Sequence, residues 1–124
     1  MASPLAETAR YSIFVVEDEA LIQMMIVEML EELGHTVVAK ANQIEPAVSL
    51  AQSAKFELAV LDVNIAGALI TPVAEIIVRR GLPFIFATGY GSAGIPPAFH
   101  GRPVLRKPFL PEALAQAIDN VMSV

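Results

Sequence analysis

The sequence predicts an α/β domain in which helices cover both faces of a five-stranded parallel sheet. Strand-like runs alternate with helix-like segments along the chain, an order that gives parallel strands joined by right-handed crossovers. The runs at residues 12–16 and 58–61 are almost continuously apolar, which is typical of strands buried on both faces. A chain of 124 residues is long enough for one domain with one core.

Strands are expected in the first half of the chain at residues 12–16, 36–39 and 58–61. A first helix is expected over residues 19–33, ended by Gly34, because apolar residues recur there at helical spacing. A second helix is expected from about residue 42 to residue 54, where Asn42 and Glu45 have the spacing of a capping box. The core-facing stripe of the first helix should comprise Ile22, Met25, Ile26, Met29, Leu30 and Leu33.

The second half of the sequence predicts a helix over residues 71–80, a strand over 83–88, a short strand at 104–105 and a last helix over 111–121. Glycines and prolines crowd residues 89–102, so the fourth helix of the alternating pattern should be short or absent. We expect residues 1–11 to form a polar leader and residues 12–124 to form the domain.

Composition excludes several classes of protein. The chain has no cysteine, which excludes disulfides and thiolate-bound zinc. The longest stretch without charged residues is broken by glycines and prolines, so no spanning helix and no membrane partner are expected. The net charge is −5 and the eight basic residues are scattered, which argues against nucleic acid as a partner. We therefore expect a cytoplasmic protein.

Polar residues gather where the predicted strands end. The first strand is followed by Glu17 and Asp18, the third by Asp62, the fourth ends at Thr88, and the fifth is followed by Lys107. Ligands of open α/β sheets bind beyond the carboxyl ends of the strands. We therefore expect three carboxylates, one hydroxyl and one ammonium to converge on one edge.

This set of groups suits phosphoryl transfer onto a carboxylate. Clustered carboxylates repel one another unless a cation neutralises them, and a site of oxygen ligands without imidazole favours Mg²⁺. The lysine can pair with a carboxylate or with an anion carried on it, and the hydroxyl can donate to the same anion. One carboxylate would then act as nucleophile while the cations offset the developing charge.

From residue 12 to residue 121 the sequence resembles the response-regulator receiver domains of two-component signalling, which have a flavodoxin-like fold. The resemblance rests on four motifs in family order: Val-Val-Glu-Asp-Glu, Ala-Val-Leu-Asp-Val-Asn, Phe-Ala-Thr-Gly-Tyr and Lys-Pro-Phe. The Phe-Ala-Thr-Gly-Tyr motif is similar to that of a receiver subgroup common in alphaproteobacteria.

The resemblance implies a role for each motif. Asp62 would be the phosphoacceptor, Thr88 and Lys107 would contact the phosphoryl group, and the Lys107–Pro108 peptide would be cis. Asp18 would bind Mg²⁺ directly, together with Asp62 and the backbone carbonyl of Asn64, and Glu17 would lie nearby or bind the ion through water.

The resemblance also implies partners and marks departures from the family pattern. A histidine kinase or phosphotransfer protein would supply the phosphoryl group, the domain would assist the transfer and its later hydrolysis, and a downstream protein would receive the output. No output domain is expected. Val104 lies where the family usually has an aromatic switch residue, and Tyr90 is the candidate to replace it. Ala66 stands where many receivers have proline.

Two other functions stay open at this point, and a third is disfavoured. A hydrolase of the haloacid-dehalogenase type also uses an aspartate nucleophile and Mg²⁺, although its Asp-x-Asp motif lies on the first strand. A receiver-like module could bind a partner without carrying phosphate. Gly89, Gly91 and Gly94 match the spacing of a dinucleotide-binding turn, but Pro96 and Pro97 interrupt the helix that such a turn must open.

Four further residues have no place in the predicted core or site. Leu21 and Met24 lie off the core stripe of the first helix, near the expected site. They are either partly buried under a neighbouring loop or form an exposed apolar patch that docks the phosphodonor. His35 and His100 are expected to be exposed and uninvolved.

Overall fold

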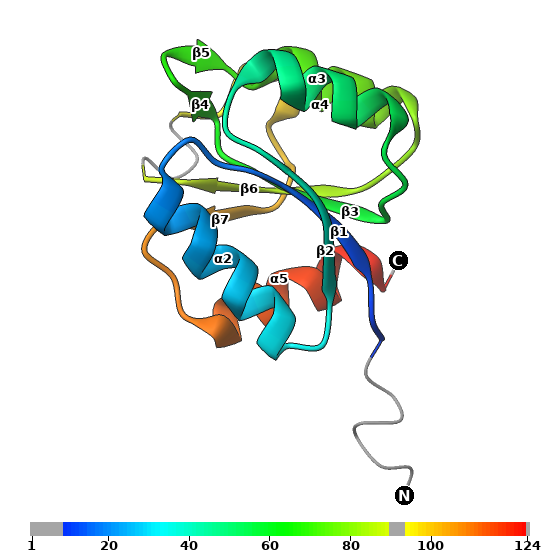
Figure 1. The fold of residues 1–124 in the computed structure, drawn as a ribbon, viewed down its shortest axis with the longest axis vertical. Coiled ribbons are helices and arrows are strands. Elements are labelled where there is room, and N and C mark those ends of the chain that lie inside the picture. The colour runs from blue at the N-terminus through cyan, green and yellow to red at the C-terminus, as the bar shows by residue number, and fades with distance from the viewer. Residues whose placement is uncertain (1–8, 90–93, 124) are drawn as a thin grey trace, which may run out of the picture.

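The computed structural model describes residues 9–89 and 94–123. Five parallel strands form one sheet in the order β2-β1-β3-β6-β7, which confirms the predicted fold class (Figure 1). The strands are β1 (Ser12–Val16), β2 (Thr36–Ala41), β3 (Leu58–Leu61), β6 (Phe84–Thr88) and β7 (Val104–Arg106).

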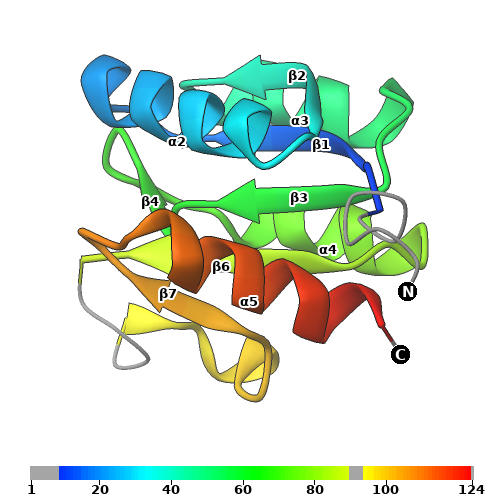
Figure 2. The same cartoon turned by 90° about the horizontal axis from the view of Figure 1, so that it is seen from below.

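Helices cover both faces of the sheet. Figure 2 shows α2 (Ala20–Glu32) and α5 (Pro111–Met122) on one face, with α3 (Ile44–Ser53) and α4 (Thr71–Arg79) on the other. The bounds of α2, α4 and α5 agree with the predicted bounds to within one residue. None of the helices in the described ranges combines the length and the apolarity needed to cross a bilayer.

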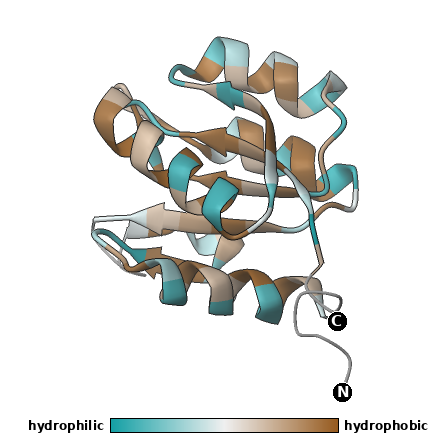
Figure 3. Cartoon of the chain, turned by 60° about the horizontal axis from the view of Figure 1, so that its bottom comes forward, coloured by the Kyte–Doolittle hydropathy of each residue, from teal (hydrophilic) through white to brown (hydrophobic). Residues whose placement is uncertain are grey.

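The alternation of side chains along the strands produces two apolar layers. Phe14, Phe84 and Phe86 point to the side of α3 and α4, whereas Ile13 and Ile85 point to the side of α2 and α5. Because both faces are covered there, the inner strands β1, β3 and β6 are almost entirely apolar, and much of the sheet is brown in Figure 3. All five side chains are fully buried, so the sheet is a well-packed platform for the loops at its carboxyl edge.

The capping box predicted at Asn42 and Glu45 is wrong. Helix α3 begins at Ile44, its N-cap residue is Gln43, and no side chain caps the helix. Glu45 lies in the first turn, where a negative charge still interacts favourably with the helix dipole.

A hairpin that the sequence did not predict follows β3. Strand β4 (Asn64–Ile65) pairs antiparallel with β5 (Ala68–Leu69), and Ala66 and Gly67 form the turn with φ of +51° and +88°. Positive φ at both central residues is characteristic of a type I′ turn, which favours Asn-Gly. Alanine in this region costs about 1–2 kcal/mol, so it is an unusual turn residue and the sequence pattern did not indicate the hairpin.

The region after β6 agrees with the expectation of a short or absent fourth helix. The structure describes one turn of 3₁₀ helix, η2 (Pro97–Phe99), before β7. Phe99 packs into the core with its ring centroid 6.0 Å from those of Phe84 and Phe86. Tyr90 and Gly91 lie outside the described residues.

His35 is buried, so the expectation that it is exposed is wrong. Its Nδ1 atom accepts a hydrogen bond of 3.1 Å from the backbone N–H of Tyr11, and the two rings stack with centroids 5.5 Å apart. Burial lowers the pKa of His35, although Asp119 opposes the shift. The Tyr11 hydrogen bond also requires an unprotonated Nδ1. His100 is exposed, as expected.

His35 predicts a loss of stability in weak acid. A histidine whose pKa is lowered by folding takes up its proton more readily in the unfolded chain, so its stabilising contribution is lost as the pH falls below about 6.5. Thermal melting between pH 7.5 and 5.5 should show a steeper decline for the wild type than for His35→Asn, whose amide oxygen can accept the same bond without titrating. Parallel curves would contradict the prediction.

Candidate functional site

The three carboxylates predicted to converge do so at the carboxyl edge of the sheet. Glu17 and Asp18 follow β1, and Asp62 follows the adjacent strand β3. One oxygen atom from each lies within 4.8 Å of the others. Glu17 is 1% exposed, so at least one of the three carboxyl groups is removed from water.

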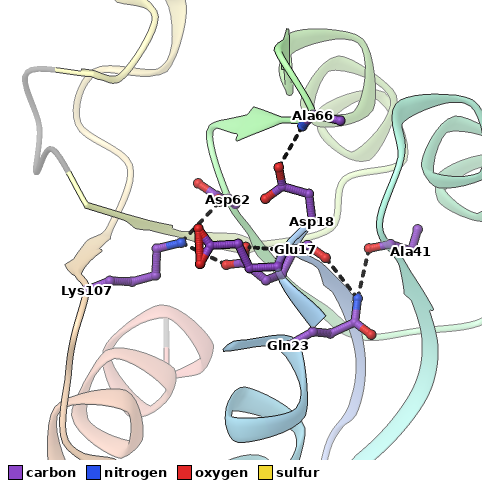
Figure 4. A network of polar contacts seen from close by, with 8 residues as sticks. Glu17, Asp18, Gln23, Ala41, Asp62, Ala66 and Lys107 are labelled. Carbon is purple, nitrogen blue, oxygen red and sulfur yellow. Dashed lines mark hydrogen bonds and ion pairs between the residues drawn. The ribbon is translucent and has the colours of Figure 1, made fainter. Parts of the chain in front are cut away.

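Lys107 bridges two of these carboxylates. Its Nζ atom lies 2.8 Å from Glu17 Oε1 and 3.1 Å from Asp62 Oδ2 (Figure 4). The backbone fixes the lysine in register with the strands, because the Lys107 N–H donates to the carbonyl of Thr88 at 2.8 Å. The Lys107–Pro108 peptide is cis, as the resemblance implied.

Burial and charge act against each other on this pair. Burial raises the pKa of Glu17 to about 7, and the nearby charge of Asp62 adds to this shift. Hydrogen bonds from Lys107 and from the Glu19 N–H partly offset it. Burial alone would lower the pKa of Lys107, but its contacts with Glu17 and Asp62 outweigh burial, and its pKa is raised. The lysine therefore stays charged and favours the ionised form of the most buried acid.

Asp18 has a different partner. Its Oδ2 atom accepts a hydrogen bond of 2.8 Å from the backbone N–H of Ala66, in the turn of the β4–β5 hairpin (Figure 4). Asn64 lies in the same hairpin and accepts from the Gly67 N–H through its side-chain oxygen at 3.1 Å. The expected metal contact of the Asn64 backbone carbonyl stays a prediction.

The site opens into a cavity of about 590 Å³ between α2, the hairpin and the loop after β7. Asp18, Asp62, Thr88 and Lys107 line its polar end. Thr88 is buried at the end of β6, so its side chain is held by the sheet beside the carboxylates. The structure thus brings together the groups that the strand ends predicted.

The other end of the cavity is apolar, and sequence reasoning missed most of it. It is lined by Ile22, Met25, Ile26, Met29, Leu69, Pro108 and Phe109. Met25 was expected in the core stripe of the first helix but is 46% exposed, because this part of α2 faces the cavity rather than the sheet. Leu69 belongs to the hairpin, which the sequence pattern did not reveal.

Leu21 and Met24 are exposed rather than covered by a loop, at 65% and 52% of their surface. They lie in the first two turns of α2, next to the cavity-lining residues Ile22 and Met25. The apolar surface of α2 therefore extends out of the cavity.

Gln23 holds the acidic end of β1 in place, a role that the sequence did not indicate. Its side-chain amide donates to the backbone carbonyls of Glu17 and Ala41, both at 3.1 Å (Figure 4). It thereby ties the first turn of α2 to the ends of β1 and β2. A glutamine four residues after the expected helix start is the available sequence signal, and it is a weak one.

The donor set fits a hard divalent cation. The oxygens of Glu17, Asp18 and Asp62 lie close enough to share one ion, and such oxygen sites are typical of Mg²⁺. No imidazole or thiol stands among these three ligands, so softer metals are less well suited.

A family model of the response regulator receiver domain matches residues 13–119. The chain therefore belongs to this family, the receiver domains of two-component signalling, which are phosphoacceptor domains rather than enzymes. The match excludes the haloacid-dehalogenase and dinucleotide-binding alternatives as descriptions of the chain.

The chain is similar to several regulators of known structure or function. It is 40% identical to SdrG from Sphingomonas melonis Fr1, with a TM-score of 0.78, covering 86% of this chain and 92% of that one. It is 30% identical to the response regulator PhyR from Brucella abortus, with a TM-score of 0.79, covering 94% of this chain and 49% of that one.

A curated relative gives a shorter match. The transcriptional regulatory protein PdtaR from Mycobacterium tuberculosis is 35% identical over 79 residues, which cover 63% of this chain and 38% of PdtaR. The chain thus spans less than half the length of PdtaR.

Gln23 predicts a specific loss of stability. Gln23→Met should lower the free energy of unfolding by about 2 kcal/mol, because two hydrogen bonds to part-buried carbonyls are lost. Chemical denaturation measures the change. The control is Gln116→Met on α5, where the amide bonds only to Asn120 on an exposed surface. Equal effects of the two substitutions would contradict the role of Gln23.

Proposed function

We propose that this receiver domain is a phosphorylation-dependent switch in which Asp62 accepts the phosphoryl group. The observation that carries the proposal is the Lys107 ammonium held between Glu17 and Asp62, at 2.8 and 3.1 Å. A cation fixed at a carboxylate can offset the charge that develops as that carboxylate attacks phosphorus. Thr88 lines the same cavity and its hydroxyl can donate to a phosphoryl oxygen.

The proposed reaction transfers one phosphoryl group between two nucleophiles. An oxygen of Asp62 attacks phosphorus, a P–O bond forms, and the P–N bond to the donor histidine breaks. The electrons of that bond return to the imidazole ring. Lys107 then pairs with the phosphoryl oxygens, and later attack by water releases phosphate and restores the Asp62 carboxylate.

Mg²⁺ is the proposed cofactor, held by Glu17, Asp18, Asp62 and the backbone carbonyl of Asn64. It would supply charge stabilisation for the transferred phosphoryl group. In this scheme Glu17 is held for metal binding by Lys107 and Gln23, and Asp18 by the hairpin.

The proposed partners are proteins on both sides of the reaction. A histidine kinase or phosphotransfer protein would donate the phosphoryl group, and a downstream protein would recognise the phosphorylated state. The exposed apolar residues Leu21 and Met24 border the cavity that contains Asp62. A donor whose histidine reaches Asp62 must cover this edge of the sheet, so these residues are candidates for the docking surface.

The first experiment tests the phosphoacceptor. Incubation with acetyl phosphate and Mg²⁺ should add the mass of one phosphoryl group to the wild type, and Asp62→Asn should abolish the addition. Chelation of Mg²⁺ should have the same effect on the wild type. Intact mass spectrometry measures the product.

Asp119→Asn is the matched control, because Asp119 is the one aspartate outside the cluster. It should label like the wild type. If Asp62→Asn is still labelled, the phosphoacceptor is a residue other than Asp62. A wild type that takes up no phosphoryl group would instead favour the alternative of a module that binds partners without phosphate.

A second experiment tests the docking surface. The experiment uses a kinase that phosphorylates the wild type. The double substitution Leu21→Ser with Met24→Ser should slow phosphotransfer from this kinase by about tenfold or more, since each apolar interface residue contributes on the order of 1–2 kcal/mol. Labelling by acetyl phosphate should be unchanged, because the small donor needs no surface.

The control for this experiment is Val38→Ser with Val78→Ser, which changes exposed apolar residues on β2 and α4. It should leave both reactions intact. If the Leu21 and Met24 substitutions impair both donors equally, the residues support the fold or the site rather than docking.

A further inference from the structure

The β4–β5 hairpin makes a direct contact with the acidic cluster. The Ala66 N–H donates to Asp18 Oδ2 at 2.8 Å, a hydrogen bond between residues 48 positions apart in the sequence. It joins the loop after β1 to the loop after β3 (Figure 4). One oxygen of Asp18 is therefore held by the backbone, which fixes the direction of the other.

Several contacts determine where the Ala66 N–H lies. Ala66 and Gly67 both have positive φ, and Asn64 Oδ1 accepts from the Gly67 N–H at 3.1 Å. The hairpin is anchored below by the fully buried Ile65. A hairpin with strands of two residues is not stable alone, so these contacts and the bond to Asp18 hold it in place.

We infer that the β4–β5 hairpin is a positioning element for divalent-cation binding, in which the Ala66 N–H orients the Asp18 carboxylate. The inference rests on the proposed Mg²⁺ site. Hydrogen bonds that orient a metal-binding carboxylate from outside the coordination sphere commonly set metal affinity. The hairpin also contains Asn64, the residue expected to offer a backbone carbonyl. The position of the hairpin therefore sets the separation of two proposed ligands.

The experiment measures the affinity of the unphosphorylated protein for Mg²⁺ by calorimetric titration. Many receivers have proline at this position, but in this chain Ala66 has positive φ and its N–H bonds to Asp18. Ala66→Pro removes that N–H and cannot adopt positive φ, so in this chain it should weaken binding by about tenfold or more. Ala66→Gly keeps the N–H and suits the turn, so it should bind like the wild type.

A second pair of variants tests the turn without touching Ala66. Asn64→Ala removes the side-chain bond that closes the turn but keeps the backbone carbonyl, and it should also weaken binding. Its matched control is Asn120→Ala, which removes an exposed amide on α5 and should leave affinity unchanged. If Ala66→Pro does not fold, this pair of variants tests the role of the hairpin in Mg²⁺ binding.

A measurement made without Mg²⁺ completes the test. Amide hydrogen exchange of Ala66 should be faster in Asp18→Ala than in the wild type when no Mg²⁺ is present. Unchanged exchange, or equal Mg²⁺ affinities across Ala66→Pro, Asn64→Ala and the wild type, would overturn the inference and leave the proposed function standing. A wild type that binds no Mg²⁺ would overturn the proposed metal site and the hairpin's role with it.

Discussion

The ion pairs of Lys107 are the interaction on which the rest of the site depends. Glu17 is almost fully buried beside Asp62, and a buried carboxylate near a like charge is unfavourable unless a cation lies close. Lys107 supplies that cation at 2.8 Å. Removing the lysine would leave Glu17 to take up a proton or to become more solvated.

The sheet keeps this arrangement in place through backbone contacts. Lys107 follows β7, and its N–H bonds to the Thr88 carbonyl at the end of β6. Asp62 follows β3, and its N–H bonds to the Val16 carbonyl at the end of β1. The charged side chains therefore project from a continuous set of parallel strands, and the two apolar layers that fix the sheet also fix the spacing of the charges.

Most of the fold and the convergence of the site could be predicted because they depend on patterns within short segments. β1 and β3 are apolar apart from Ser12, and their bounds match those predicted. Parallel pairing then brings residues that follow the strands to one edge, which is why Glu17, Asp62 and Lys107 could be grouped before any geometry was known.

The features that could not be predicted depend on contacts distant in sequence. The burial of His35 arises from its packing against Tyr11, and nothing near His35 in the sequence indicates it. The hairpin turn uses alanine where Asn-Gly is usual, and its bond to Asp18 becomes visible only in three dimensions. Met25 has the spacing of the helical core stripe, but its side chain faces the cavity instead of packing against the sheet.

The charge of the cluster connects the fold to the proposed switch. With all acids ionised, three carboxylates and one ammonium leave a formal charge of −2, which one divalent cation would neutralise. Phosphorylation of Asp62 would replace one negative charge with about two, and the added charge would have to be offset by nearby donors. Thr88 and Lys107 line the same cavity and are linked through the backbone. A rearrangement driven by the new charge would therefore act first on the ends of β6 and of its neighbour β7, the edge strand on this side of the sheet.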